Sequence, residues 1–204
     1  MFFSQGICWE PFLPKSKARR PILPTQLSAL DIDIGLENVW ADLHVFCISA
    51  NVAFQTDQKI NPEIFQDILI SIEYRLLLLD LGKDGFLETL RLGILAFSTT
   101  VFLQTQGIKA RFNNLSRQLQ VSISRLEIFD DSLDEAWLWI LFVTAVSTVT
   151  NEDDYWLMPL LKAALLKTGK VTWEEVQDML KSFMWIDVLH DKDGKRVFDQ
   201  VVLQ

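Results

Sequence analysis

Cysteine, histidine and positive charge are scarce in this 204-residue chain. Cys8 and Cys47 are the only thiols, which excludes the dense cysteine set of a secreted disulfide scaffold and indicates a reducing, intracellular compartment. With only two histidines beside them, a zinc site is not expected. The 27 acidic residues outnumber the 19 basic ones and leave a formal net charge of -8. Nucleic-acid binding through this chain is therefore not expected, because no positive field draws it onto a phosphate backbone.

A secretory signal and a membrane span are also missing from the sequence pattern. The N-terminus is apolar before it is basic, the reverse of a signal peptide, and Trp9, Glu10 and Pro11 interrupt the apolar run. Two uncharged stretches, residues 92–108 and 136–151, are each shorter than about 18 residues and contain Ser, Thr, Gln or Asn. These stretches predict buried core helices.

Hydrophobic residues make up 50% of the chain, and from Glu37 onward they recur at helical spacing with no competing strand-length alternation. Capping-box patterns at residues 132–135 and 172–175 predict two helix starts. The expected helices cover residues 37–54, 62–81, 85–106, 112–129, 132–151, 152–168 and 172–185, followed by an Asp-Gly turn at 191–194 and a short C-terminal segment. The sequence thus predicts an all-α fold, a single bundle of about seven helices over residues 36–204.

The first 35 residues are rich in proline and predict an extended arm laid on the helical domain. A small basic cluster occurs in this arm, formed by Lys15, Lys17, Arg19 and Arg20. It matches a nuclear-import signal, but the solvated face of a linker is the favoured interpretation. The cytoplasm is therefore favoured over the nucleus.

Three helical segments together carry a family resemblance: residues 88–104 (ETLRLGILAFSTTVFLQ), 136–161 and 172–201. They look like the C-terminal part of the helical regulatory domain of fungal zinc-cluster transcription factors, and the resemblance covers roughly residues 65–204. Such factors read DNA through a module with six cysteines, whereas this chain has two. The resemblance implies an all-helical domain of the kind that senses or binds small molecules, without the DNA-reading head.

A polar and aromatic stripe on the first predicted helix is the main candidate site. Its members recur at spacings of four, three and four: Trp40, His44, Cys47 and Asn51. In a pocket, His44 and Asn51 would serve as the catalytic pair that binds or polarises a ligand, and its walls would come from Trp40, Cys47, Phe97 and Trp137. The alternative is structural, with His44 and Asn51 satisfying backbone groups of neighbouring elements.

An acidic motif, residues 130–134 (DDSLD), resembles the magnesium-diphosphate motif of class I terpene synthases. Carboxylates one turn apart can hold Mg²⁺. The same residues place Ser and acids at a helix N-terminus, where the helix dipole favours them, and no second metal motif follows. The helix-start interpretation is favoured, and neither a metal nor a cofactor is expected.

Two further groups of charged residues have structural explanations. Asp187, His190 and Asp191 could form an acid–base pair, but the polar segment favours a solvated helix end that leads into the Asp-Gly turn. Arg75 and Arg91 lie among apolar residues and are expected to pair with nearby acids such as Glu73, Asp80 or Glu88.

Two function classes remain. The first is a cofactor-free biosynthetic catalyst that holds an apolar metabolite for cyclisation, pericyclic rearrangement or isomerisation, and this class is slightly favoured. The second is a ligand sensor or interaction protein without chemistry, which includes a homodimer that regulates a longer relative. Both classes place an apolar small molecule inside a Trp- and Phe-rich fold.

Overall fold

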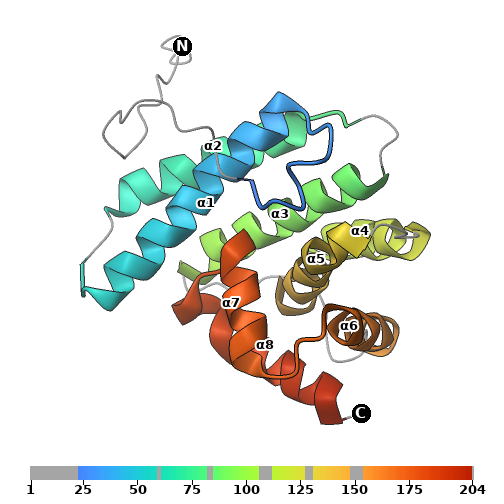
Figure 1. Ribbon diagram of the computed structural model, residues 1–204. Coiled ribbons are helices and arrows are strands. Elements are labelled where there is room, and N and C mark those ends of the chain that lie inside the picture. The colour runs from blue at the N-terminus through green and yellow to red at the C-terminus, as the bar shows by residue number, and fades with distance from the viewer. Residues whose placement is uncertain are drawn as a thin grey trace.

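The computed structural model describes residues 23–58, 61–81, 85–105, 112–126, 131–147 and 154–203. Within these ranges it contains eight α-helices, one 3-10 turn and no strand, which confirms the all-α prediction (Figure 1). The elements are α1 (Ile34–Gln55), α2 (Pro62–Leu78), α3 (Gly85–Thr105), α4 (Asn113–Arg125), η1 (Asp131–Leu133), α5 (Asp134–Ser147), α6 (Asp154–Thr168), α7 (Trp173–Phe183) and α8 (Asp187–Leu203). Most of the predicted N-terminal arm, with its basic cluster, lies outside the described residues.

Helix α5 lies at the centre of the bundle. Its sequence is uncharged after the first turn, and nine of its 14 residues are buried, because α3, α6, α7 and α8 all pack against it. Helix α3 lies between α5 and the α1–α2 pair (Figure 1). The window Gly85–Gln104 of α3 is long and apolar enough to cross a membrane, but 61% of it is buried inside the protein, as in the core helix of a soluble fold.

Local signals place most helix starts where the sequence predicts them. Asp33 accepts a hydrogen bond from Gly35 N at 2.7 Å and begins α1, and Asn61 caps α2 ahead of Pro62. The predicted capping box of α7 is present, with Thr172 and Glu175 bonding reciprocally.

Helix α8 corrects the predicted C-terminus. An Asp-Gly turn was expected at residues 191–194, but α8 runs without a break from Asp187 to Leu203. Gly194 is buried within this helix, and a Cβ atom on it would lie 2.7 Å from Trp185 and 2.8 Å from Trp173. The glycine therefore allows two indole rings to pack closely against α8, and the chain does not turn at this position.

Alanine at position 194 is expected to lower the free energy of unfolding by about 1–3 kcal/mol, since overpacking outweighs the helix propensity that alanine gains. Gly93→Ala is the matched control in α3. Its Cβ would meet Trp139 at 3.6 Å, an ordinary contact, so that variant should be as stable as the parent chain or slightly more so. Urea unfolding of both variants measures the difference. Equal stabilities would show that the two indole rings do not require a glycine.

Candidate functional site

The polar and aromatic stripe of α1 faces the connection between α7 and α8. Trp40 and Cys47 are buried, with 1% and 3% of their surfaces exposed, whereas His44 and Asn51 are half-buried. Asn51 Nδ2 donates to Trp185 O at 2.9 Å, and Asn51 Oδ1 accepts from Asp187 N at 2.9 Å. Both ends of the amide are therefore bound to backbone, as the structural alternative requires.

Two other helices supply further side chains to the same connection. Trp139 Nε1 on α5 donates to Met184 O at 2.8 Å, and His190 Nδ1 on α8 accepts from Ile186 N at 3.1 Å. We refer to residues 184–187 as the α7–α8 corner. Three side chains from three helices thus satisfy backbone groups in the corner that lie outside regular helix hydrogen bonding.

Aromatic rings surround the corner and form the centre of the core. Trp139 packs against Trp40, Phe97 and Phe183 with ring centroids 5.8, 6.3 and 6.2 Å apart. His190 lies 4.9 Å from the rings of both Phe97 and Trp185. Trp40 and Phe97, two of the residues proposed as pocket walls, therefore both pack against Trp139, which the sequence analysis did not single out. The predicted wall residue Trp137 is partly buried at the edge of this core.

The titratable members of the stripe are held neutral. Burial lowers the pKa of His44 and raises the pKa of the Cys47 thiol well above its usual range, although that thiol contacts the backbone of Trp185. His44 has no hydrogen-bond partner among the described residues. Two surface hollows, one between α3 and α4 and one beside α8, are lined by residues outside α1. None of the six predicted site residues lines either hollow.

His190 corrects the prediction of a solvated helix end, since only 1% of its surface is exposed. Burial lowers the pKa of His190 to about 3. The neighbouring acids bind other groups: Asp191 accepts from Trp185 Nε1 and Gln177 Nε2, and Asp187 forms an ion pair with Lys181. The acid–base pair considered for this segment is therefore not formed.

The acidic motif is occupied by a lysine. Lys167 Nζ lies 2.7 Å from Asp131 and 2.8 Å from Asp134, while Asp130 lies outside the described residues. Among the residues that the structure describes, no group of three or more His, Cys, Asp or Glu side chains is arranged to hold a metal ion.

The two arginines expected to pair with acids both do so. Arg91 binds Glu88, one of the acids left open by the sequence, with nitrogen–oxygen distances of 2.7 and 2.6 Å. Arg75 binds Asp42 on α1 at 2.7 Å, an acid outside the predicted set. Glu73, which was in that set, is half-buried, and burial raises its pKa.

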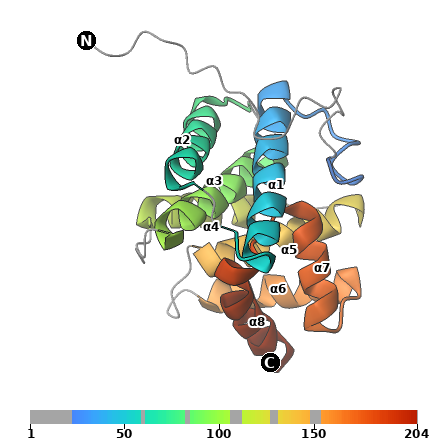
Figure 2. The ribbon, with the colours of Figure 1, turned by 90° about the vertical axis from the view of Figure 1, so that its left-hand side faces the viewer.

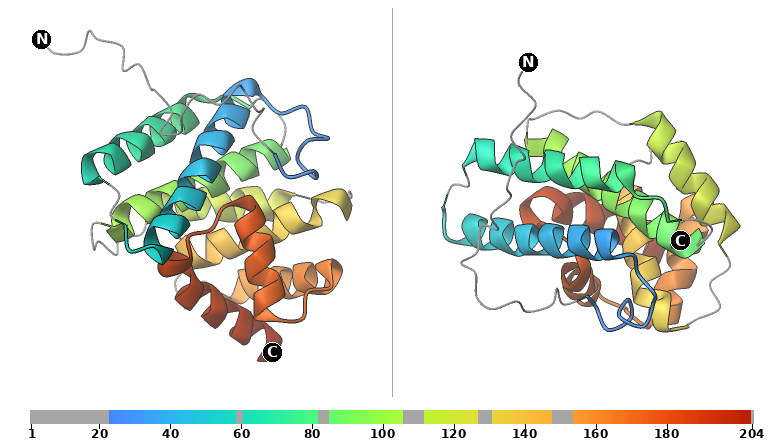
Figure 3. Two further views of the ribbon diagram at one scale, coloured as in Figure 1. Left: turned by 60° about the vertical axis from the view of Figure 1, so that its left-hand side comes forward. Right: turned by 90° about the horizontal axis from the view of Figure 1, so that it is seen from above.

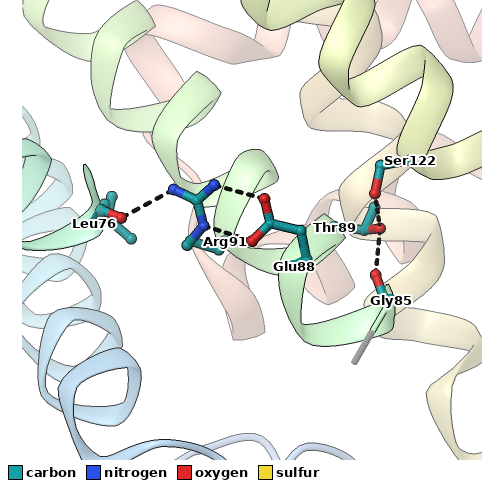
Figure 4. A network of polar contacts seen from close by, with 6 residues as sticks. All are labelled: Leu76, Gly85, Glu88, Thr89, Arg91 and Ser122. Atoms are coloured by element: carbon teal, nitrogen blue, oxygen red, sulfur yellow. Dashed lines mark hydrogen bonds and ion pairs between the residues drawn. The ribbon is translucent and has the colours of Figure 1, made fainter. Parts of the chain in front are cut away.

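An open groove of about 510 Å³ lies between α3 and α4, and its lining includes three arginine side chains. Beside the groove, Thr89 on α3 donates to Gly85 O at 2.7 Å and lies 2.5 Å from Ser122 Oγ on α4 (Figure 4). The lining residues are Gly85, Glu88, Arg91, Leu92, Arg117, Gln118, Val121, Ser122, Arg125 and Leu126.

The three arginines of this groove have different roles. Arg91 is structural, because it also donates to Leu76 O at 2.9 Å and so ties the end of α2 to α3 (Figure 4). Arg117 and Arg125 are exposed on α4 and form no ion pair or hydrogen bond with the described residues. Sequence reasoning missed the groove, although the spacing of Arg117, Val121 and Arg125 by four residues was a signal of a shared helix face.

A second open hollow, of about 540 Å³, lies at the surface of α8 beside Trp173. Two of its basic lining residues are paired with acids: Lys195 binds Asp199, and Arg196 binds Asp193. The α3–α4 groove is therefore the stronger candidate site, since Arg117 and Arg125 have no acidic partner among the described residues.

Comparisons with protein-family models, with curated proteins and with solved structures found no match to this chain.

Replacing Asn51 by alanine should lower the free energy of unfolding by about 1–3 kcal/mol, because Trp185 O and Asp187 N lose their partner. Asn38→Ala is the control, since it makes the same change at an exposed position of the same helix. Chemical denaturation of both variants tests this. An Asn51 variant no less stable than the control would contradict the structural role of the amide.

Stability should also fall as the pH drops below about 6.5. The folded chain keeps His190 neutral down to a pKa of about 3, whereas the unfolded chain takes up a proton near pH 6.5. The stabilisation is therefore complete above pH 6.5 and is lost below it, at up to about 1.4 kcal/mol per pH unit. Denaturation measured between pH 6.5 and 5 should show a shallower slope for His190→Gln than for the parent chain.

His44→Gln is the control for this experiment. The pKa of His44 is also lowered, so its removal should reduce the slope, but less than removal of the fully buried His190. A parent chain whose stability does not change over this pH range would contradict the burial of both histidines.

Proposed function

We propose that the protein is a small-molecule-binding helical domain whose ligand is an anion with an apolar portion, held in the α3–α4 groove. The observation that carries this proposal is a pair of guanidinium groups, Arg117 and Arg125, that have no partner among the described residues and lie beside a groove of about 510 Å³. Guanidinium groups bind carboxylate and phosphate oxygens through paired hydrogen bonds, and they stay charged at neutral pH.

The local charge of the groove opposes that of the whole chain. Glu88 and Arg91 neutralise each other, so Arg117 and Arg125 leave the described part of the lining positive in a protein whose net charge is -8. The surrounding negative charge weakens non-specific attraction of anions elsewhere on the surface. An acidic ligand is therefore drawn to this groove in particular.

The groove also has an apolar part. Val121 lies between the two arginines on α4 and is 42% exposed, and Leu92 and Leu126 line the groove beside it. A rise of about 1.5 Å per residue separates the Cα atoms of Arg117 and Arg125 by about 12 Å along α4. This span suits a ligand with an acidic group at one end and a short hydrocarbon or aromatic body that covers Val121.

The groove supports binding rather than chemistry. Glu88, the carboxylate among its described lining residues, is held by Arg91, and guanidinium groups do not exchange protons readily at neutral pH. A cyclase or isomerase activity, and kinship with the regulatory domain of fungal zinc-cluster factors, stay predictions from the sequence. A ligand sensor is the class that agrees with a groove of this composition.

Titration calorimetry with octanoate and octanol tests the proposal, since the two probes share a hydrocarbon body and differ in charge. Octanoate should bind saturably at one site, and octanol should bind at least tenfold more weakly. Arg117→Gln and Arg125→Gln should each weaken octanoate about three- to tenfold, the equivalent of about 0.7–1.4 kcal/mol for an exposed charged hydrogen bond. Octyl phosphate, used in parallel, distinguishes a phosphate ligand from a carboxylate.

Lys162→Gln is the matched control, because it removes one exposed positive charge from α6, outside the groove. It should leave the octanoate affinity unchanged. Equal affinities for octanoate and octanol, or equal losses in the arginine and lysine variants, would refute an anion site between α3 and α4.

A further inference from the structure

A chain of three oxygen atoms lies at the contact between α3 and α4. Helix α4 packs mainly against α3, at the edge of the bundle (Figures 2 and 3). At this contact Thr89 Oγ1 lies 2.7 Å from Gly85 O and 2.5 Å from Ser122 Oγ (Figure 4). Thr89 is fully buried, whereas Ser122 is half-buried and lines the α3–α4 groove. Ser122 therefore connects these buried polar groups with the surface of the groove.

The positions of the two hydroxyl protons follow from this chain of oxygen atoms. Gly85 O is a carbonyl oxygen and can only accept, so Thr89 donates its one hydroxyl proton to it. The contact between Thr89 and Ser122 then needs a proton from the other side, and Ser122 must donate it. The Ser122 proton is thus held between the two helices, and the oxygen has only lone pairs left for the groove. Ser122 can therefore accept a hydrogen bond from a ligand, but it has no proton left to donate.

This proton arrangement decides which part of a ligand Ser122 can bind. An oxygen without a free proton does not stabilise an acidic group, so the acid of the ligand binds Arg117 or Arg125. Ser122 is left for a second ligand group, one that carries a proton on oxygen or nitrogen. An ammonium group is disfavoured there, because the two arginines leave the described part of the lining positive. A neutral hydroxyl satisfies both conditions.

The spacing along α4 places this hydroxyl near the acidic end of the ligand. The Cα atom of Ser122 lies about 4.5 Å along the helix axis from that of Arg125, at a rise of about 1.5 Å per residue. The apolar side chains of Leu92, Val121 and Leu126 also line the groove. A hydroxyl close to the acid leaves the hydrocarbon body of the ligand free to cover these apolar side chains.

We propose that the ligand of the α3–α4 groove is a hydroxy acid with a hydrocarbon body, and that Ser122 accepts the hydrogen bond of its hydroxyl. This inference rests on the proposed function of the groove as an anion site, and it adds the residue that selects among anions. Arg117 and Arg125 distinguish ligands by charge. Ser122 distinguishes a ligand that can donate a proton beside its acid from a ligand that cannot.

Titration calorimetry with octanoate, 3-hydroxyoctanoate and 3-methoxyoctanoate tests this inference. The hydroxy acid can donate from its added oxygen, whereas the methoxy acid carries the same oxygen without a proton. The hydroxy acid should bind about three- to tenfold more tightly than octanoate, as expected for one hydrogen bond, and the methoxy acid no more tightly than octanoate. Ser122→Ala should remove the advantage of the hydroxy acid and leave the octanoate affinity within about twofold of the parent value, a change below that of one hydrogen bond. Ser124→Ala makes the same change at an exposed position of α4 outside the groove lining, and it should retain the advantage.

The outcomes separate this inference from the proposed function. Octanoate binding that depends on Arg117 and Arg125, with equal affinities for octanoate and the hydroxy acid, would overturn the hydroxyl contact and leave the anion site standing. Equal gains for the hydroxy and methoxy acids, or a Ser122→Ala variant that keeps the advantage, would overturn the role of Ser122. Binding of none of the three acids would overturn both proposals. The comparison of the hydroxy and methoxy acids uses the parent chain, so it does not depend on the folding of a variant.

Discussion

The buried backbone of the α7–α8 corner is the constraint on which the rest of the core depends. Peptide groups that leave a helix inside the protein still need hydrogen-bond partners, and an unmet group costs about 1–3 kcal/mol. Trp139, Asn51 and His190 meet that need from α5, α1 and α8. Because each bond has a fixed direction, the corner sets where these three helices lie around one another.

Aromatic packing follows from the same arrangement. Trp139 must reach Met184 O, so its indole ring extends across the core and provides the surface against which Trp40, Phe97 and Phe183 pack. Trp185 lies over Gly194 on α8, and its ring nitrogen donates to Asp191. The stripe on α1 that resembled a ligand pocket is thereby used largely for assembly, since its asparagine holds the corner and its tryptophan fills the core.

The feature with capacity for binding lies away from this centre. The described lining of the α3–α4 groove is positive because Arg117 and Arg125 lack acidic partners among the described residues, in a chain whose net charge is -8. Arg91 ties the groove to the end of α2, since it binds Glu88 in the groove and Leu76 O on α2. The opposite signs of the groove and of the whole chain favour an anionic ligand at this groove over the rest of the surface.

The sequence by itself determined the helices up to α7, the Thr172 capping box and the burial of α5, because each depends on residues within a turn or two of one another. Only the tertiary structure decided that Asn51 binds the backbone of Trp185, which lies 134 residues away in the sequence. The same holds for the pairing of Arg75 with Asp42 and for the groove between α3 and α4. Gly194 and His190 show the difference most clearly. An Asp-Gly pair favours a turn when only its neighbours count, but the contact of Gly194 with Trp173 and Trp185 keeps the helix continuous and buries the histidine one turn before it.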